Sequence, residues 1–194
     1  MARARGFVHG LWRLFCYGLA AAFLVVVLVQ GWFFACVLWW NYQEPSSSAF
    51  MDARLASLRE KNPKATLAHR WVAYGRISNN LKRAVVAAED AKFIGHAGFD
   101  WEAISKAIER NEKKGRVVAG ASTISQQLAK NLFLSGERSY LRKGQEAVIT
   151  WMLESVMSKR RILELYLNFA EWGEGVFGAE AAARYHFGTS AASL

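Results

Sequence analysis

An uncharged stretch near the N-terminus constrains the fold more than any other feature of the chain. From residue 14 to residue 43, 30 residues include no Asp, Glu, Lys or Arg. A helix needs about 20 apolar residues to cross the hydrocarbon core of a bilayer. The C-terminal end of the stretch carries aromatic side chains that suit a membrane interface: Trp32, Trp39, Trp40 and Tyr42. Residues 14–43 are therefore predicted to form a transmembrane anchor.

A cleaved signal peptide is the alternative interpretation of this segment. The apolar region of a signal peptide is usually about 7–15 residues long, whereas this stretch is longer and rich in aromatic residues. Arg3, Arg5 and Arg13 precede it, with no acidic residue among them. The positive-inside rule then predicts a basic cytoplasmic tail at residues 1–13 and export of the chain from about Glu44 onward.

Charge narrows the choice of partners. The chain has 25 basic and 16 acidic side chains, a formal net charge of +9. Such a surface suits a domain close to an anionic bilayer, so membrane lipids are expected partners. Nucleic acid also attracts basic proteins, but an exported domain rarely meets it, and the sequence has no zinc-finger, RNP or basic-zipper pattern. We expect no nucleic-acid partner.

The exported part has the pattern of helices joined by short loops. Pro45 and the serines after it indicate a juxtamembrane linker, which we place at residues 44–66. Beyond it, apolar residues recur at helical spacing after five residues that can cap a helix: Ser78, Asp100, Thr123, Ser139 and Ser158. Three glycines predict a loop before a last helix at 179–187, and no segment predicts a β-hairpin. The class is mainly α.

Catalytic signatures exclude several kinds of enzyme. The sequence has no HExxH, paired CxxC, GxxxxGK[ST] or GxSxG motif, which excludes the common zinc, phosphate-loop and serine-hydrolase sites. The histidines are too scattered to predict a metal site. What remains is a set of acidic, basic and amide side chains between Glu89 and Glu180.

Two clusters stand out in that region. Glu89 and Asp90 end an apolar helical segment, where acidic side chains oppose the helix dipole. Such an unfavourable placement is expected mainly at functional sites. A second cluster combines charges of both signs within nine residues: Arg138, Arg142, Lys143 and Glu146. Each cluster also has a structural interpretation, as a solvated helix end or as surface ion pairs.

Five segments, in order and spacing, resemble the motifs of glycosyltransferase family 51. They are EDAKFIGHAGFD, GASTISQQLAKN, RKGQE, SKRRILELYLN and GEGVFGAEAAARYHFG. The single N-terminal span is similar to that of the monofunctional peptidoglycan transglycosylases within the family. The resemblance covers roughly residues 67–194 and implies a lysozyme-like α-helical glycosyltransferase domain there. Because family members continue past Gly188 with further helices, it also implies a C-terminal lobe that is incomplete in this chain.

The resemblance implies an inverting glycosyl transfer in bacterial cell-wall synthesis. The donor would be a glycan chain on undecaprenyl pyrophosphate, and the acceptor would be lipid II. The product would be a β-1,4-linked strand, with undecaprenyl pyrophosphate released. The expected location is the bacterial inner (cytoplasmic) membrane, with the N-terminus cytoplasmic and the catalytic domain periplasmic. Other cell-wall synthesis or division proteins are candidate partners.

The resemblance also implies roles for particular residues. Glu89 matches the catalytic base and Glu146 the second acidic residue of the family. The expected pyrophosphate- or sugar-binding residues are Lys130, Arg138, Arg142, Lys143, Gln127 and Ser122. The sequence requires no cofactor and shows no metal site, while the resemblance allows a divalent cation, Mg²⁺ or Mn²⁺, at the pyrophosphate.

The chemistry of these residues fits the transfer and leaves two other interpretations open. An inverting transfer needs a carboxylate that takes the proton of the attacking hydroxyl, and a pyrophosphate leaving group needs positive charge. A membrane-anchored lytic transglycosylase or lysozyme-like enzyme would use a glutamate as an acid, without needing the basic cluster. A non-catalytic scaffold of the cell-wall machinery is the other alternative.

Overall fold

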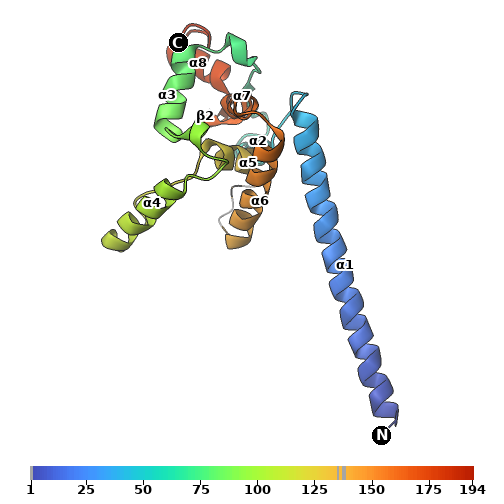
Figure 1. Ribbon diagram of the computed structural model, residues 1–194. Helices are drawn as coiled ribbons and strands as arrows, with labels where there is room; N and C mark the ends of the chain where they lie inside the picture. Colours follow the sequence, from blue (N-terminus) through green and yellow to red (C-terminus); the bar gives the residue numbers. More distant parts are fainter. Residues whose placement is uncertain (1, 135, 137–138) are drawn as a thin grey trace.

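The computed structural model describes residues 2–134, 136 and 139–194 (Figure 1). Its helices are α1 (Ala2–Trp40), α2 (Ala49–Lys61), α3 (Asn79–Glu89), α4 (Trp101–Lys114), α5 (Ile124–Phe133), α6 (Tyr140–Val156), α7 (Lys159–Phe169) and α8 (Ala179–Phe187). Short 3-10 turns lie at Tyr74–Arg76 and Phe93–Gly95, and the strands are β1 (Ala68–His69), β2 (Glu171–Gly173) and β3 (Val176–Phe177). The prediction of a mainly α chain is confirmed.

The predicted helix starts are confirmed by their capping bonds. Five side chains each accept a hydrogen bond from a backbone N–H in the first turn of the helix that follows: Ser78, Asp100, Thr123, Ser139 and Ser158. At α5 the bond is reciprocated, because Thr123 and Gln126 form a capping box. A cap of this kind stabilises a helix by about 0.5–2 kcal/mol.

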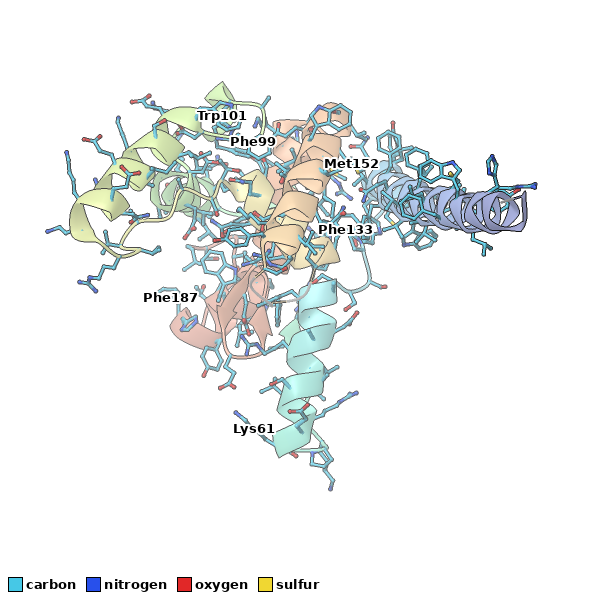
Figure 2. All side chains as sticks on the ribbon, turned by 90° about the horizontal axis from the view of Figure 1, so that it is seen from below. Lys61, Phe99, Trp101, Phe133, Met152 and Phe187 are labelled. Carbon is cyan, nitrogen blue, oxygen red and sulfur yellow. The ribbon has the colours of Figure 1, made fainter. Side chains whose placement is uncertain are left out.

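Helix α1 extends away from the rest of the chain, with its C-terminal end beside the domain (Figure 1). Its segment Trp12–Trp40 is long and apolar enough to cross a membrane. The covered side chains recur at helical spacing near the C-terminal end: Gln30, Phe33, Cys36, Val37 and Trp40. Figure 2 shows Phe133 on the side of the domain that faces this helix, and its ring lies 5.4 Å from that of Phe33 and 4.9 Å from that of Trp40. Residues 2–13, expected to be a tail, continue the same helix.

The segment expected to be a linker, residues 44–66, contains helix α2. Ser48 caps this helix, and Met51 is buried against the domain. An ion pair between Arg54 and Glu171, with a nitrogen–oxygen distance of 2.7 Å, ties α2 to β2. The helix packs on α5. Its apolar and polar residues are mixed around the helix rather than divided between two faces, so its position depends on these tertiary contacts.

The core of the domain lies where α5 packs between α6 and α7. The fully buried side chains there are Ile124, Leu128, Ile149, Leu153, Ile162, Leu165 and Phe169. Removing a side chain of this kind typically costs about 2–5 kcal/mol. The three helices are therefore a rigid base for the polar side chains that they carry on their exposed faces.

The loop predicted between the last two helices contains a β-hairpin, so the expectation of no hairpin was wrong. Strand β2 pairs antiparallel with β3, and β1 adds a parallel strand on the other side of β3. Strands of two or three residues are too short to show alternation, which is recognisable only over about 4–8 residues. Gly178 then leads into α8 with φ +82°, and a Cβ there would lie 2.7 Å from the carbonyl oxygen of Asn168.

Candidate active site

Glu89 is the last residue of α3, and its side chain is exposed. It lines a groove of about 290 Å³ whose walls come from one face of α3, from α7 and from β2. The groove is largely apolar, with Tyr166, Glu171 and Trp172 opposite the helix. Glu89 therefore lies at the edge of a space that can receive a substrate.

Glu89 also lines a second hollow, of about 260 Å³, on the side of the loop before α5. That hollow is bordered by Lys92, Asp100 and residues 120–123. Ser122 lines it and also lines a neighbouring hollow under α4, together with Lys143. A ligand that reaches from Glu89 past Ser122 would therefore meet the basic side chains of α6.

The carboxylate of Glu89 is held by a side chain of α5. Gln127 Nε2 donates a hydrogen bond of 2.9 Å to Glu89 Oε2 and lies 3.5 Å from the carbonyl oxygen of Ser122. Gln127 Oε1 accepts a hydrogen bond of 3.0 Å from the hydroxyl of Tyr166 on α7. Burial, and then the negative charge of Glu89, raise the pKa of the Tyr166 phenol, which therefore stays protonated.

Asp90, next to Glu89, has a different role. Its carboxylate is buried and accepts hydrogen bonds from His96 Nε2, at 2.9 and 3.1 Å, and from the backbone N–H of Ile124, at 3.1 Å. It thereby joins the end of α3 to the start of α5, where a negative charge is favourable. The paired acids of the sequence are thus one exposed carboxylate in the groove and one buried carboxylate that holds two helices together.

The predicted basic residues gather around Glu146. This carboxylate is 3% exposed, and it accepts a hydrogen bond of 2.8 Å from Arg142 and another from Lys143. Lys143 also lies 3.4 Å from the hydroxyl of Ser122. The structure thus brings Glu146, Arg142, Lys143 and Ser122 together, while Arg138 lies outside the described residues.

Lys130 belongs to the same group. Its ammonium lies 5.5 Å from the centre of the Phe50 ring, a cation–π contact. Burial lowers the pKa of Lys130, and the charges of Arg142 and Lys143 act in the same direction, while that of Glu146 opposes them. Burial and mutual repulsion make such a group of cations a favourable place for an anion.

The described residues do not provide a metal site. Within them, no three His, Cys, Asp or Glu side chains gather to hold an ion. The carboxylate of Glu146 is already bound by two cationic side chains. We therefore derive no step through a metal ion.

Tyr166 and Asp90 are the residues whose part in the site the sequence did not reveal. Tyr166 lies in the segment SKRRILELYLN, which the family resemblance marked without showing a contact with the site, and Asp90 is half of an acidic pair. The unfavourable position of that pair at a helix end was the available signal. It indicates a functional site without separating the two acids.

Comparison with known proteins gives a consistent result. Residues 56–194 match the family model described as transglycosylase. The chain is 64% identical over 182 residues to the biosynthetic peptidoglycan transglycosylase of Methylobacillus flagellatus, an alignment that covers 94% of this chain and 80% of that protein. It is 64% identical over 184 residues to the same-named protein of Thiobacillus denitrificans, covering 95% and 79% of the two chains. The corresponding protein of Nitrosospira multiformis is 60% identical over 188 residues, covering 97% and 80%.

Proposed function

Because the chain belongs to the transglycosylase family, we propose that it polymerises lipid II into β-1,4-linked glycan strands of peptidoglycan. The reaction inverts the configuration at the anomeric carbon and releases undecaprenyl pyrophosphate. The observation that carries this proposal is the position of Glu89. It is an exposed carboxylate at a groove, connected through Ser122 to a group of cations.

Glu89 acts as the general base. It accepts the proton of the 4-hydroxyl of the acceptor sugar, and the hydroxyl oxygen forms the new bond to the anomeric carbon of the donor. The bond from that carbon to the pyrophosphate oxygen breaks at the same time, and its electron pair leaves with the pyrophosphate. At the end of the step Glu89 carries the proton and the pyrophosphate carries the electron pair of the broken bond.

The cationic group receives the leaving pyrophosphate. Lys130, Arg142 and Lys143 present positive charge where negative charge develops, which lowers the barrier to departure. Glu146 keeps Arg142 and Lys143 in place, with bonds to both. A lytic enzyme acting on finished glycan has no pyrophosphate to stabilise, so this group favours the transferase over the lytic alternative.

The proposal is tested by Glu89→Gln in the 194-residue chain, assayed with lipid II. Glutamine keeps the shape of the side chain but cannot accept a proton at neutral pH. General-base catalysis typically contributes about 10²–10⁴-fold, so we expect polymerisation to fall by that order. Glu60→Gln, at an exposed position of α2, is the matched control and should keep the wild-type rate.

Three outcomes would contradict the proposal. Glu89→Gln protein that polymerises at the wild-type rate would remove Glu89 as the base. Wild-type protein that shortens preformed glycan, and makes no polymer, would indicate the lytic enzyme. Wild-type protein that binds lipid II without turning it over would indicate the scaffold.

A further inference from the structure

Glu89, Gln127 and Tyr166 form a chain of hydrogen bonds whose direction is determined by chemistry. An ionised carboxylate can only accept, so Gln127 must present its NH₂ group to Glu89. The amide oxygen then faces Tyr166, and the phenol must donate to it. The three side chains come from α3, α5 and α7, so the chain of bonds crosses the helices that surround the groove.

The Tyr166 end of this chain is rigid. The residue is 5% exposed and belongs to the main core cluster, on a helix whose neighbouring side chains Leu165 and Leu167 are fully buried. Its raised pKa keeps the phenol a donor throughout the physiological range. Glu89, by contrast, is exposed at the end of its helix, and within the described part of the chain its carboxylate accepts a hydrogen bond from Gln127.

We propose that Tyr166 is a positioning residue that acts through Gln127 to orient the carboxylate of the base, Glu89. This inference rests on the proposed function. Tyr166 holds the oxygen end of the Gln127 amide, so that the NH₂ end stays at Oε2 of Glu89. The other carboxylate oxygen, Oε1, is then available to accept the proton of the acceptor hydroxyl.

Without the phenol, the amide oxygen of Gln127 loses its hydrogen-bond donor, so the side chain is no longer held at that end. Gln127 could then move away from Oε2, and the carboxylate of Glu89 would sample other rotamers. Misplacement of a catalytic group by about 1 Å can cost on the order of 10²-fold in rate. Loss of the phenol should therefore lower kcat and leave substrate binding little changed.

The test begins with Tyr166→Phe, which removes one oxygen and keeps the ring. We expect kcat for lipid II polymerisation to fall about tenfold, with KM within about twofold of wild type. The matched control is Ser158→Ala, which removes the cap of the same helix and leaves the hydrogen-bond chain intact. It should lower the melting temperature and keep kcat.

A double-mutant cycle shows whether Tyr166 acts through Gln127. Gln127→Met has nearly the same length but can neither donate to Glu89 nor accept from Tyr166. If Tyr166 works only through this amide, adding Tyr166→Phe to Gln127→Met should change kcat by less than about twofold. Independent effects that multiply would overturn the proposal. If Tyr166→Phe does not fold, Gln127→Met, a substitution at a half-buried position, still tests the proposal. A Gln127→Met enzyme with the wild-type kcat would overturn it.

The results separate this inference from the proposed function. If the Glu89→Gln enzyme keeps wild-type activity, both the proposed function and the positioning role of Tyr166 are wrong. If Glu89→Gln loses activity but Tyr166→Phe keeps the wild-type kcat, as Ser158→Ala should, only the positioning role is wrong. A raised KM with unchanged kcat in Tyr166→Phe would make Tyr166 a substrate contact and would also overturn the inference.

Discussion

Lys130 shows how one residue combines burial with charge. Its side chain is half-buried, which lowers the pKa of the ammonium, and two neighbouring cations add to this effect. A lysine with a lowered pKa loses its charge at a lower pH than a solvated lysine does. An anion bound beside it would restore the charged form. The same features that make Lys130 unfavourable in the free protein therefore suit it to a pyrophosphate.

We predict that Lys130→Ala lowers polymerisation at least about tenfold, since a charge-assisted hydrogen bond to phosphate contributes about 1.5–3 kcal/mol. Lys130→Arg keeps a charge that does not titrate, so its activity should persist to higher pH than that of wild type. Steady-state rates with lipid II across neutral and alkaline pH measure both effects. Lys61→Ala, at an exposed position of α2, serves as the control. Equal activity of Lys130→Ala and wild type would exclude Lys130 from the leaving-group site.

At the scale of elements, the junction between the β-hairpin and α8 depends on close backbone approach. Gly178 lies at φ +82°, a region that side chains disfavour, directly against the backbone of Asn168. The Asn168 amide in turn binds both backbone groups of Val72, with Oδ1 accepting at 2.8 Å and Nδ2 donating at 3.0 Å. One buried asparagine therefore joins α7 to the segment after β1, and Gly178 allows α8 to pack beside it.

We predict that Gly178→Ala destabilises the protein by about 1–3 kcal/mol, because the substitution adds both backbone strain and a clash. In a chain of this size the melting temperature should fall by several degrees. The melting temperature is measured by thermal unfolding of the purified protein in detergent. Gly75→Ala is the control, since a Cβ at Gly75 meets nothing within 4 Å and its φ is not positive. An unchanged melting temperature for Gly178→Ala would contradict the packing described at this junction.

At the scale of the whole molecule, the anchor helix is attached to the domain by specific polar contacts. Arg161 of α7 donates to the carbonyl oxygen of Trp40, at 2.7 and 3.0 Å, and to that of Gln43, at 2.6 Å. Gln30 exchanges two hydrogen bonds with Gln145 of α6, at 2.7 and 3.0 Å. About 20 residues suffice to cross a bilayer, so the last turns of this 39-residue helix are available to pack against the domain. The C-terminal part of α1 is therefore joined directly to α6 and α7.

We predict that the domain lies on the periplasmic side. Ser46 is exposed just beyond α1, and Ser46→Cys, in a background where Cys16 and Cys36 are serine, should react with a membrane-impermeant thiol reagent in intact spheroplasts. Ala2→Cys, at the other end of the helix, should react only after lysis. The reverse labelling pattern would contradict the orientation expected from the positive-inside rule.

Much of the fold could be predicted from the sequence because helix starts depend on residues only a few positions apart. The helix starts at Asp100, Thr123 and Ser158 follow from a capping side chain and the apolar spacing after it. The hairpin at β2 and β3 was missed because each strand is too short to show alternation. Helix α2 was missed because an ion pair and a buried methionine hold it, and neither is visible in its own sequence pattern.

The sequence by itself determined the anchor helix, the capped helices and the types of side chain that gather at the site, because periodicity and capping act within a few residues. The family resemblance singled out Glu89 as the expected base, but only the tertiary structure placed its side chain at a groove and showed what holds it. Gln127 is 38 residues from Glu89 and 39 from Tyr166, and Asp90 is 34 residues from the backbone N–H that it caps. Contacts over such separations depend on how helices pack across a shared core, and no local pattern encodes that packing.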